Sequence, residues 1–209
     1  MPAILSGAAA GILLNAFINI LTPVERKREF TFLYRYPAVI LVTTASFAVC
    51  NFKYGYSHNF YAYSAMACFA AAASFIDLQH GIIPDALNFV GFIAGIGFGI
   101  LKRNPSDSIL GAVLGLLVMA TIYFISRGGM GAGDVKFTAV LGLFLGFPLI
   151  IPALIFSFIT GALIGAGLVI GGRKSMKDTM PFGPFLGAGT LISAVWGNDL
   201  IYFYLSLFI

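Results

Sequence analysis

The sequence predicts an all-α polytopic membrane bundle of about eight transmembrane helices, forming a single integral-membrane domain over residues 1–209. Of the 209 residues, 59% are hydrophobic and only 10% are charged, whereas soluble domains carry roughly 25% charged residues. Apolar stretches also recur from one end of the chain to the other, and most are long enough to cross a hydrocarbon layer of about 30 Å. We therefore expect the chain to lie in a lipid bilayer.

Polar breaks divide the chain into the candidate spans. The first lacks the basic start of a signal peptide, so it is expected to be a retained helix. The sixth has only 13 residues, about 20 Å of helix, so it must start deep, tilt, or form a hairpin with the seventh across Phe147 and Pro148. The eighth is interrupted by Asn198 and Asp199, which places its expected end near Trp196, followed by an interfacial tail. The eight spans are 3–21, 37–52, 60–76, 86–101, 109–125, 135–147, 148–170 and from 185 onward.

The basic residues set the expected orientation. With eight spans, the first, third, fifth and seventh loops lie on one side and carry nine of the twelve Lys and Arg residues. By the positive-inside rule, these loops face the cytoplasm and both termini lie outside. The charge then serves topology and contact with anionic lipid headgroups, and no nucleic-acid partner is expected. The nine residues are Arg26, Lys27, Arg28, Arg35, Arg127, Lys136, Arg173, Lys174 and Lys177, against Lys53, Lys102 and Arg103 opposite.

The two cysteines, Cys50 and Cys68, lie inside apolar runs and have no CxxC spacing. Such a pattern indicates neither a zinc site nor a disulfide framework. Burial as small hydrophobic side chains explains both, and we expect neither a metal nor a cofactor.

Two of the eight acidic residues are candidates for chemistry. Asp77 ends the third span on the cytoplasmic side, and Asp134 follows a glycine-rich segment just before the sixth span, so both lie on one side at one depth. Carboxylates at a membrane boundary are costly when desolvated and are functional candidates. Two close carboxyl groups share one proton, because like charges a few ångström apart cannot both ionise cheaply. Such a pair activates water against a peptide carbonyl without a metal or a covalent nucleophile.

Glycines support the candidate site, but each aspartate also has a simpler structural interpretation. Gly131 and Gly133 lack Cβ atoms, so the chain can turn sharply and a substrate backbone can approach Asp134. Alternatively, Asp77 is a helix-end charge that reaches water, and Asp134 caps the helix that follows it. A proton-coupled transporter or channel would use the same aspartates to bind ions, although its carboxylates would normally lie near the bilayer centre. A membrane scaffold would tolerate substitution of both.

Three motifs surround these positions. Residues 77–85 read DLQHGIIPD, residues 129–136 read GMGAGDVK, and residues 181–186 read PFGPFL. In these motifs the chain resembles the type 4 prepilin peptidases, the GxGD membrane aspartyl proteases that process prepilins and pseudopilins. Asn19 and the Arg35-Tyr36-Pro37 step into the second span are also similar to that family, so the resemblance covers nearly the whole chain.

The resemblance implies cleavage of a short basic leader from a prepilin or pseudopilin, at the cytoplasmic face of the bacterial inner membrane. It makes Asp77 and Asp134 the catalytic pair, within a peptidase core roughly over residues 55–172. Asp85 is expected to cap the fourth span, and Lys136 either biases which carboxylate keeps the proton or extends to the interface. The residues expected to support the site are Gly131, Gly133, Lys136, Pro84 and Asp85.

The first loop departs from many family members. Those that also methylate the new N-terminus with S-adenosylmethionine carry a long loop with paired CxxC motifs, and a Glu after the Arg-Tyr-Pro step. Here the loop covers only residues 22–36 and has no cysteine, and the Glu position holds Ile40. Methyltransferase activity is therefore expected to be absent.

Overall fold

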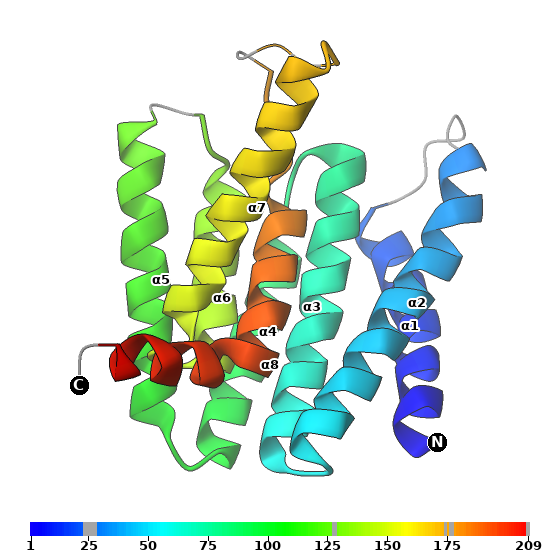
Figure 1. Cartoon of the computed structure of the whole chain (residues 1–209). Helices are drawn as coiled ribbons and strands as arrows, with labels where there is room; N and C mark the ends of the chain where they lie inside the picture. Colours follow the sequence, from blue (N-terminus) through cyan, green and yellow to red (C-terminus); the bar gives the residue numbers. More distant parts are fainter. Residues whose placement is uncertain (23–28, 127–128, 174, 176–177, 208–209) are drawn as a thin grey trace.

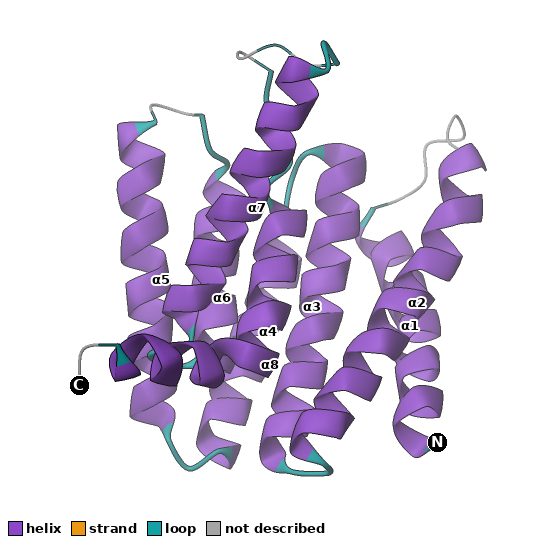
Figure 2. Cartoon of the chain, in the orientation of Figure 1, coloured by secondary structure: helices purple, strands orange, loops and turns teal. Residues whose placement is uncertain are grey.

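The described part of the chain forms eight helices and contains no strand (Figures 1 and 2). The computed structural model describes residues 1–22, 29–126, 129–173, 175 and 178–207. The predictions that rest on Glu25, Arg26, Lys27, Arg28, Arg127, Lys174 and Lys177 lie outside these residues. The helices are α1 (Pro2–Leu21), α2 (Glu29–Tyr54), α3 (His58–His80), α4 (Asp85–Leu101), α5 (Pro105–Ile125), α6 (Ala132–Leu145), α7 (Ile150–Ile170) and α8 (Gly183–Ser206).

The predicted polytopic helical membrane bundle is confirmed. Five of the described helices are long and apolar enough to cross a membrane: α1, the Tyr34–Tyr54 part of α2, α3, α5 and α7. Large apolar side chains of α1, α4, α5 and α7 point outward and are exposed. This is the surface that a lipid-facing bundle requires, since hydrocarbon rather than water is its solvent.

The second helix begins earlier than predicted. Sequence reasoning placed its start at Pro37, because the apolar run begins there after a polar break. Instead, α2 begins at Glu29 and continues through Pro37, where the missing proline N–H removes one intrahelical hydrogen bond. The connection between α1 and α2 therefore shortens from the predicted residues 22–36 to residues 22–28.

Of the three alternatives for the short sixth span, the hairpin correctly placed a turn at Phe147 and Pro148, but α6 packs against α5 and α4 rather than against α7. α6 has only 14 residues and ends at Leu145, and α7 begins at Ile150 after a cis peptide bond between Phe147 and Pro148. Gly146 has a φ of 79°, a backbone conformation that glycine adopts without the steric cost of a Cβ atom.

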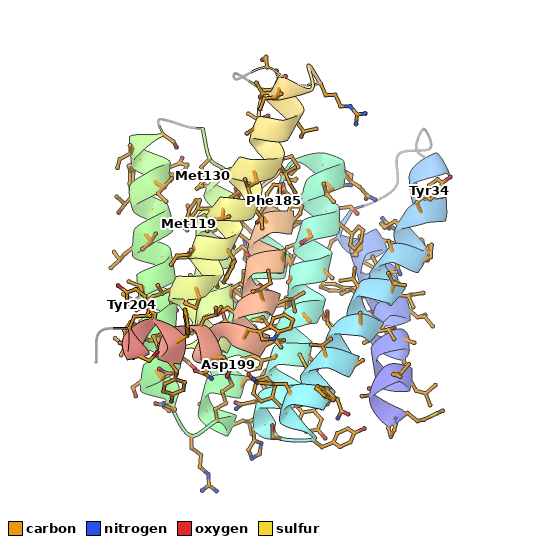
Figure 3. All side chains as sticks on the ribbon, in the orientation of Figure 1. Tyr34, Met119, Met130, Phe185, Asp199 and Tyr204 are labelled. Carbon is orange, nitrogen blue, oxygen red and sulfur yellow. The ribbon has the colours of Figure 1, made fainter. Side chains whose placement is uncertain are left out.

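The last helix does not end near Trp196, as the sequence suggested, but continues to Ser206. In Figure 1 its red C-terminal part turns away from the orange part and runs across the bundle. Asp199, labelled in Figure 3, accepts a 2.6 Å ion pair from the Lys53 amine of α2. The Tyr54 hydroxyl also donates to the Ala194 carbonyl, at 2.5 Å. These contacts tie the end of α2 to α8 where that helix changes direction.

α3 is the central and most buried of the candidate spans. It contacts α2, α4, α6 and α8, and its run of four alanines, Ala70 to Ala73, lets its neighbours approach closely. The last turn of α3 and the first turns of α4, α6 and α8 lie toward the upper end of the bundle in Figure 1. Four helix ends from distant parts of the sequence therefore meet in one region.

A buried arginine joins the first two helices to the end of α3. One Arg35 guanidinium nitrogen donates to the Asn19 side-chain carbonyl, and the other lies 3.3 Å from the Gln79 side-chain oxygen. The Asn19 amide donates to the Tyr36 hydroxyl at 2.5 Å. Asn19 and the Arg-Tyr-Pro step thus link α1 and α2 to α3, two residues beyond Asp77.

Candidate active site

Asp77 lies in the last turn of α3 and is only 5% exposed. The helix ends just beyond it, because Gly81 takes the left-handed conformation (φ 68°) and donates its N–H to the Asp77 carbonyl oxygen at 2.7 Å. The alternative of a helix-end charge that reaches water is therefore wrong for Asp77. Its carboxylate is instead held inside the protein.

Asp134 lies in the first turn of α6 and is 8% exposed. The N-cap of α6 is Gly131, and the Asp134 carboxylate accepts a hydrogen bond from the Gly131 backbone N–H, so Asp134 helps to cap the start of this helix from within its first turn. Its Oδ1 atom has no hydrogen-bond partner among the described residues. Asp134 lies outside the candidate membrane spans, and burial, with a smaller contribution from the Asp77 carboxylate, raises its pKa from 3.8 to about 6.

Two glycines allow the start of α6 to approach the connection between α3 and α4. A Cβ atom on Gly133 would lie 3.2 Å from both the Cβ and the carbonyl oxygen of Ile83. A Cβ atom on Gly131 would lie 3.1 Å from the Asp134 Oδ2 atom. Glycine at these positions therefore keeps the two motifs in contact and leaves space beside the carboxylate.

A single pocket of about 410 Å³ brings the predicted site together. It opens between the α3–α4 connection and the first turn of α6, and Gly81, Ile82, Ile83 and Ala132 complete its wall. All seven residues singled out from the sequence line it: Asp77, Pro84, Asp85, Gly131, Gly133, Asp134 and Lys136.

Asp85 and Lys136 differ from their expected contacts. The Lys136 amine lies 2.7 Å from Asp85 Oδ1, so it pairs with that carboxylate rather than with Asp134. Asp85 does not cap α4 through its side chain: Pro84 is the N-cap, and no side-chain cap bond is formed. As an acidic residue in the first turn, Asp85 still stabilises the positive end of the helix. The exposed ion pair joins α4 to α6 at the rim of the pocket.

Gly183 belongs to the site, although sequence reasoning gave it no role. Its N–H donates to Asp77 Oδ2 at 2.8 Å, and a Cβ atom there would lie 2.9 Å from the same oxygen. Gly183 is the first residue of α8, whose N-terminal N–H groups lack intrahelical partners and favour a negative charge. Phe185, labelled in Figure 3, marks this first turn. The PFGPFL motif was the available signal, and it lies beyond the predicted core 55–172.

The arrangement can support acid and base chemistry by two carboxyl groups. Asp77 accepts a backbone N–H from Gly183, and Asp134 accepts one from Gly131. Two buried carboxyl groups in one pocket can share a single proton, so that one acts as the acid and the other as the base. Among the described residues, no group of three His, Cys, Asp or Glu side chains is placed to hold a metal ion. Hydrolysis without a metal remains a prediction of the sequence.

Known proteins are similar to this chain over most of its length. The sequence matches the type IV leader peptidase family over residues 64–166. The prepilin leader peptidase/N-methyltransferase of Bacillus subtilis (strain 168) is 32% identical over 180 residues, which cover 83% of this chain and 71% of the relative. The protein of the same name from Xanthomonas campestris pv. campestris is 29% identical, and the match covers 82% of this chain and 62% of the relative. The one from Pseudomonas putida is 32% identical, and the match covers 79% of this chain and 60% of the relative. No solved structure matches the chain. By its sequence and its motifs, the chain belongs to the type IV leader peptidase family.

Proposed function

We propose that this protein is an aspartic endopeptidase that removes the short basic leader from type 4 prepilins or pseudopilins, with Asp77 and Asp134 as its catalytic pair. The observation that carries the proposal is the meeting of these two buried carboxyl groups, from separate helices, in one pocket. Membership of the leader peptidase family supplies the class of substrate.

In the proposed reaction, ionised Asp77 takes a proton from a water molecule as that water attacks the carbonyl carbon of the scissile peptide. Protonated Asp134 donates a hydrogen bond to the carbonyl oxygen and stabilises the negative charge that develops there. The proton held by Asp77 then passes to the leaving amine as the carbon–nitrogen bond breaks. The Gly183 N–H holds Asp77 in place and favours its ionised form at the start of the cycle.

The pocket is proposed to face the cytoplasm from the bacterial inner membrane. Arg35, Lys136 and Arg173 lie toward the end of the bundle that carries the pocket, near the start of α2, the start of α6 and the end of α7. Lys53, Lys102 and Arg103 lie at the opposite helix ends, but nine of the twelve basic residues of the sequence belong to the side predicted to be cytoplasmic. This distribution supports a cytoplasmic active site, because positive residues are retained on the cytoplasmic side of a membrane.

The catalytic pair is tested by Asp77→Asn and Asp134→Asn. Each change should abolish leader removal from a co-expressed prepilin, measured as loss of the size shift on a gel, while the enzyme still accumulates in the membrane. Asp85→Asn is the matched control: it alters a third carboxyl group in the same pocket, and its exposed ion pair is worth at most about 1 kcal/mol. Wild-type processing by either of the first two variants would refute the pair, and complete loss in Asp85→Asn would show that the wrong carboxylate was chosen.

A second part of the proposal is that the protein lacks methyltransferase activity. The connection between α1 and α2 covers only residues 22–28, and no cysteine occurs in it. Purified protein incubated with a prepilin and S-adenosylmethionine should yield a product with an unmodified N-terminus. A mass gain of one methyl group on the mature product would contradict this part and leave the peptidase assignment intact.

A further inference from the structure

We call the outer surface between α4 and α5, with α6 beneath it, the trough; the catalytic pocket and a second pocket lie along it. α6 contacts both of these helices far more extensively than they contact each other, and α5 and α6 stand beside each other in Figure 1. Glycines bring α4 down onto the floor: Cβ atoms on Gly91 and Gly95 would lie within 2.8 Å of Val140 and Leu143.

The α4 wall of the trough begins at the catalytic pocket. Asp85, Phe89, Phe92 and Ile96 are spaced so that they lie along one face of α4, because residues three and four positions apart are neighbours on a helix. Asp85 lines the catalytic pocket, and the three apolar side chains that follow it are 66%, 46% and 40% exposed. The wall therefore changes from charged to apolar as it leaves the pocket.

The floor of the trough follows the same course on α6. Ala132, Lys136, Ala139 and Leu143 have the same helical spacing as the residues of the α4 wall. Ala132 and Lys136 line the catalytic pocket, whereas Leu143 lines a second pocket farther along. The ion pair between Lys136 and Asp85 marks the boundary between the polar and the apolar parts.

The second pocket, of about 350 Å³, is the far part of this trough. Its surface is apolar, and its main contributors are Phe92, Ile96, Ile109, Ala112, Val113 and Leu143. α4 has 17 residues, about 25 Å of helix, so a segment lying along the trough would cross most of a hydrocarbon layer of about 30 Å.

We infer that the trough binds the apolar transmembrane helix of the substrate, in the position that lets the residues just before that helix enter the catalytic pocket. The inference rests on the proposed function, since it assumes cleavage at the pocket of Asp77 and Asp134. The two pockets lie along the same faces of α4 and α6, and this alignment favours the substrate over other occupants. The apolar lining and outward-facing walls require a membrane-embedded helix, because an extended or polar segment would leave unpaired groups in hydrocarbon. Substrate recognition is then largely a matter of helix packing in the membrane.

Site-specific crosslinking tests the trough directly. A photoreactive phenylalanine analogue is placed at Phe92 or Val113, and at Ile159 on the outer face of α7 as a control, since Val113 and Ile159 are 47% and 48% exposed. The experiment is done with the full chain in membranes, in an Asp134→Asn background that retains the uncleaved substrate. Crosslinks to the apolar helix of the prepilin should form from Phe92 and Val113 and should be at least about tenfold weaker from Ile159, as expected of a specific contact.

Several crosslinking results would overturn the inference: equal capture from Ile159, products containing only lipid or a second copy of this chain, or no substrate product from the trough. Leader removal by the wild-type protein is measured in parallel. If the wild-type protein cleaves the substrate but the trough does not capture it, the inference is wrong and the proposed function stands. If the wild-type protein does not cleave, the proposed function fails whatever the crosslinks show.

Val113→Trp, compared with Ile159→Trp, supplies an independent kinetic test. Filling the trough should raise KM for the full-length prepilin by about tenfold with little change in kcat, because binding is lost before the chemical step. Cleavage of a peptide that contains the leader and scissile bond but lacks the apolar helix should be unchanged. An equal effect of Ile159→Trp, or an unchanged KM in Val113→Trp, would refute the trough.

Discussion

Replacing Gly183 with alanine tests whether the start of α8 controls Asp77. The added Cβ atom would lie 2.9 Å from Asp77 Oδ2 and 3.1 Å from Asp77 Cβ. Either α8 or the last turn of α3 must move by several tenths of an ångström, and the 2.8 Å hydrogen bond from the Gly183 N–H is then lost or lengthened. The carboxylate would lose its backbone donor, although no catalytic side chain has been changed.

The size of the effect follows from the hydrogen bond. A bond to a charged group contributes about 1.5–3 kcal/mol, and each 1.4 kcal/mol corresponds to roughly a tenfold change in rate. If the bond holds Asp77 in its reactive position, Gly183→Ala should lower kcat by about one to two orders of magnitude. Its effect on KM should be small, because the substrate helix does not contact Gly183 in the proposed trough.

The assay measures leader removal from a purified prepilin by enzyme in proteoliposomes, with the cleaved N-terminus identified by mass spectrometry. Gly97→Ala is the matched control, since Gly97 lies inside α4 and a Cβ atom there would have no other atom within 4 Å. This control should cleave normally, because alanine favours helix over glycine by about 1 kcal/mol. Thermal unfolding of both variants in detergent separates a catalytic effect from loss of fold.

Cleavage by Gly183→Ala at the wild-type rate would show that its N–H does not position Asp77. A similar loss of activity in Gly183→Ala and Gly97→Ala would also refute the reasoning, because any replacement of glycine by alanine would then lower the activity. Loss of folded Gly183→Ala protein would show that the close approach of α8 to α3 is required for assembly, and Gly183→Ser would then give no recovery.

Three further changes test other parts of the structure. Burial raises the pKa of Asp134 to about 6, so this carboxyl group loses its proton as the pH rises through that value. In a pH–rate profile, kcat/KM should therefore fall above about pH 6. A kcat/KM that rises over this range would contradict the role of Asp134 as the acid. Lys102→Met removes the amine that donates to the Phe144 carbonyl at 2.5 Å. This change should lower the free energy of unfolding by about 1.5–3 kcal/mol, measured by thermal unfolding. An unchanged unfolding temperature would mean that this contact is not formed. Arg35→Met removes the donors to Asn19 and Gln79 and should destabilise the protein by about 2–3 kcal/mol in the same assay. Arg35→Lys should recover only part of this stability, because an ammonium group cannot reproduce the forked guanidinium contact.

The sequence predicted that the two aspartates lie at the same depth in the membrane, because hydropathy alone shows where each apolar run ends. Asp77 and Asp134 each adjoin an apolar run at the same side of the membrane, so their depth could be predicted without knowing which helices touch. The glycine-rich approach to Asp134 also indicated a close contact, which the structure places against Ile83.

Contacts between helices could not be predicted in this way. The Gly183–Asp77 hydrogen bond joins residues 106 positions apart, and hydropathy gives the depth of a helix but not its neighbours. For the same reason, the pairing of Lys136 with Asp85 was not foreseen. The early start of α2 was missed because the predicted span followed the apolar run, whereas the helix also includes the more polar residues from Glu29 onward.

The shortness of α6 leads to a prediction about polar groups far from the pocket. A helix of 14 residues that begins at the membrane boundary ends inside the bundle, so its last carbonyl groups need donors where water is scarce. Lys102 donates to the Phe144 carbonyl, and its amine also lies 4.3 Å from the centre of the Tyr63 ring of α3. The far end of the helix that carries Asp134 is thereby joined to the helix that carries Asp77.

At the pocket, the Gly183 N–H joins α8 to Asp77 of α3, and Gly133 of α6 lies against Ile83, three residues beyond the end of α3. α6 is therefore linked to α3 through Lys102 at the far end and through the connection that follows α3 at the pocket. Such a frame can hold two buried carboxyl groups close together before a substrate arrives, which avoids the reorganisation that a flexible site would require in the transition state. Lys102→Met should therefore slow cleavage at temperatures well below its unfolding transition; full activity at those temperatures would limit its role to stability.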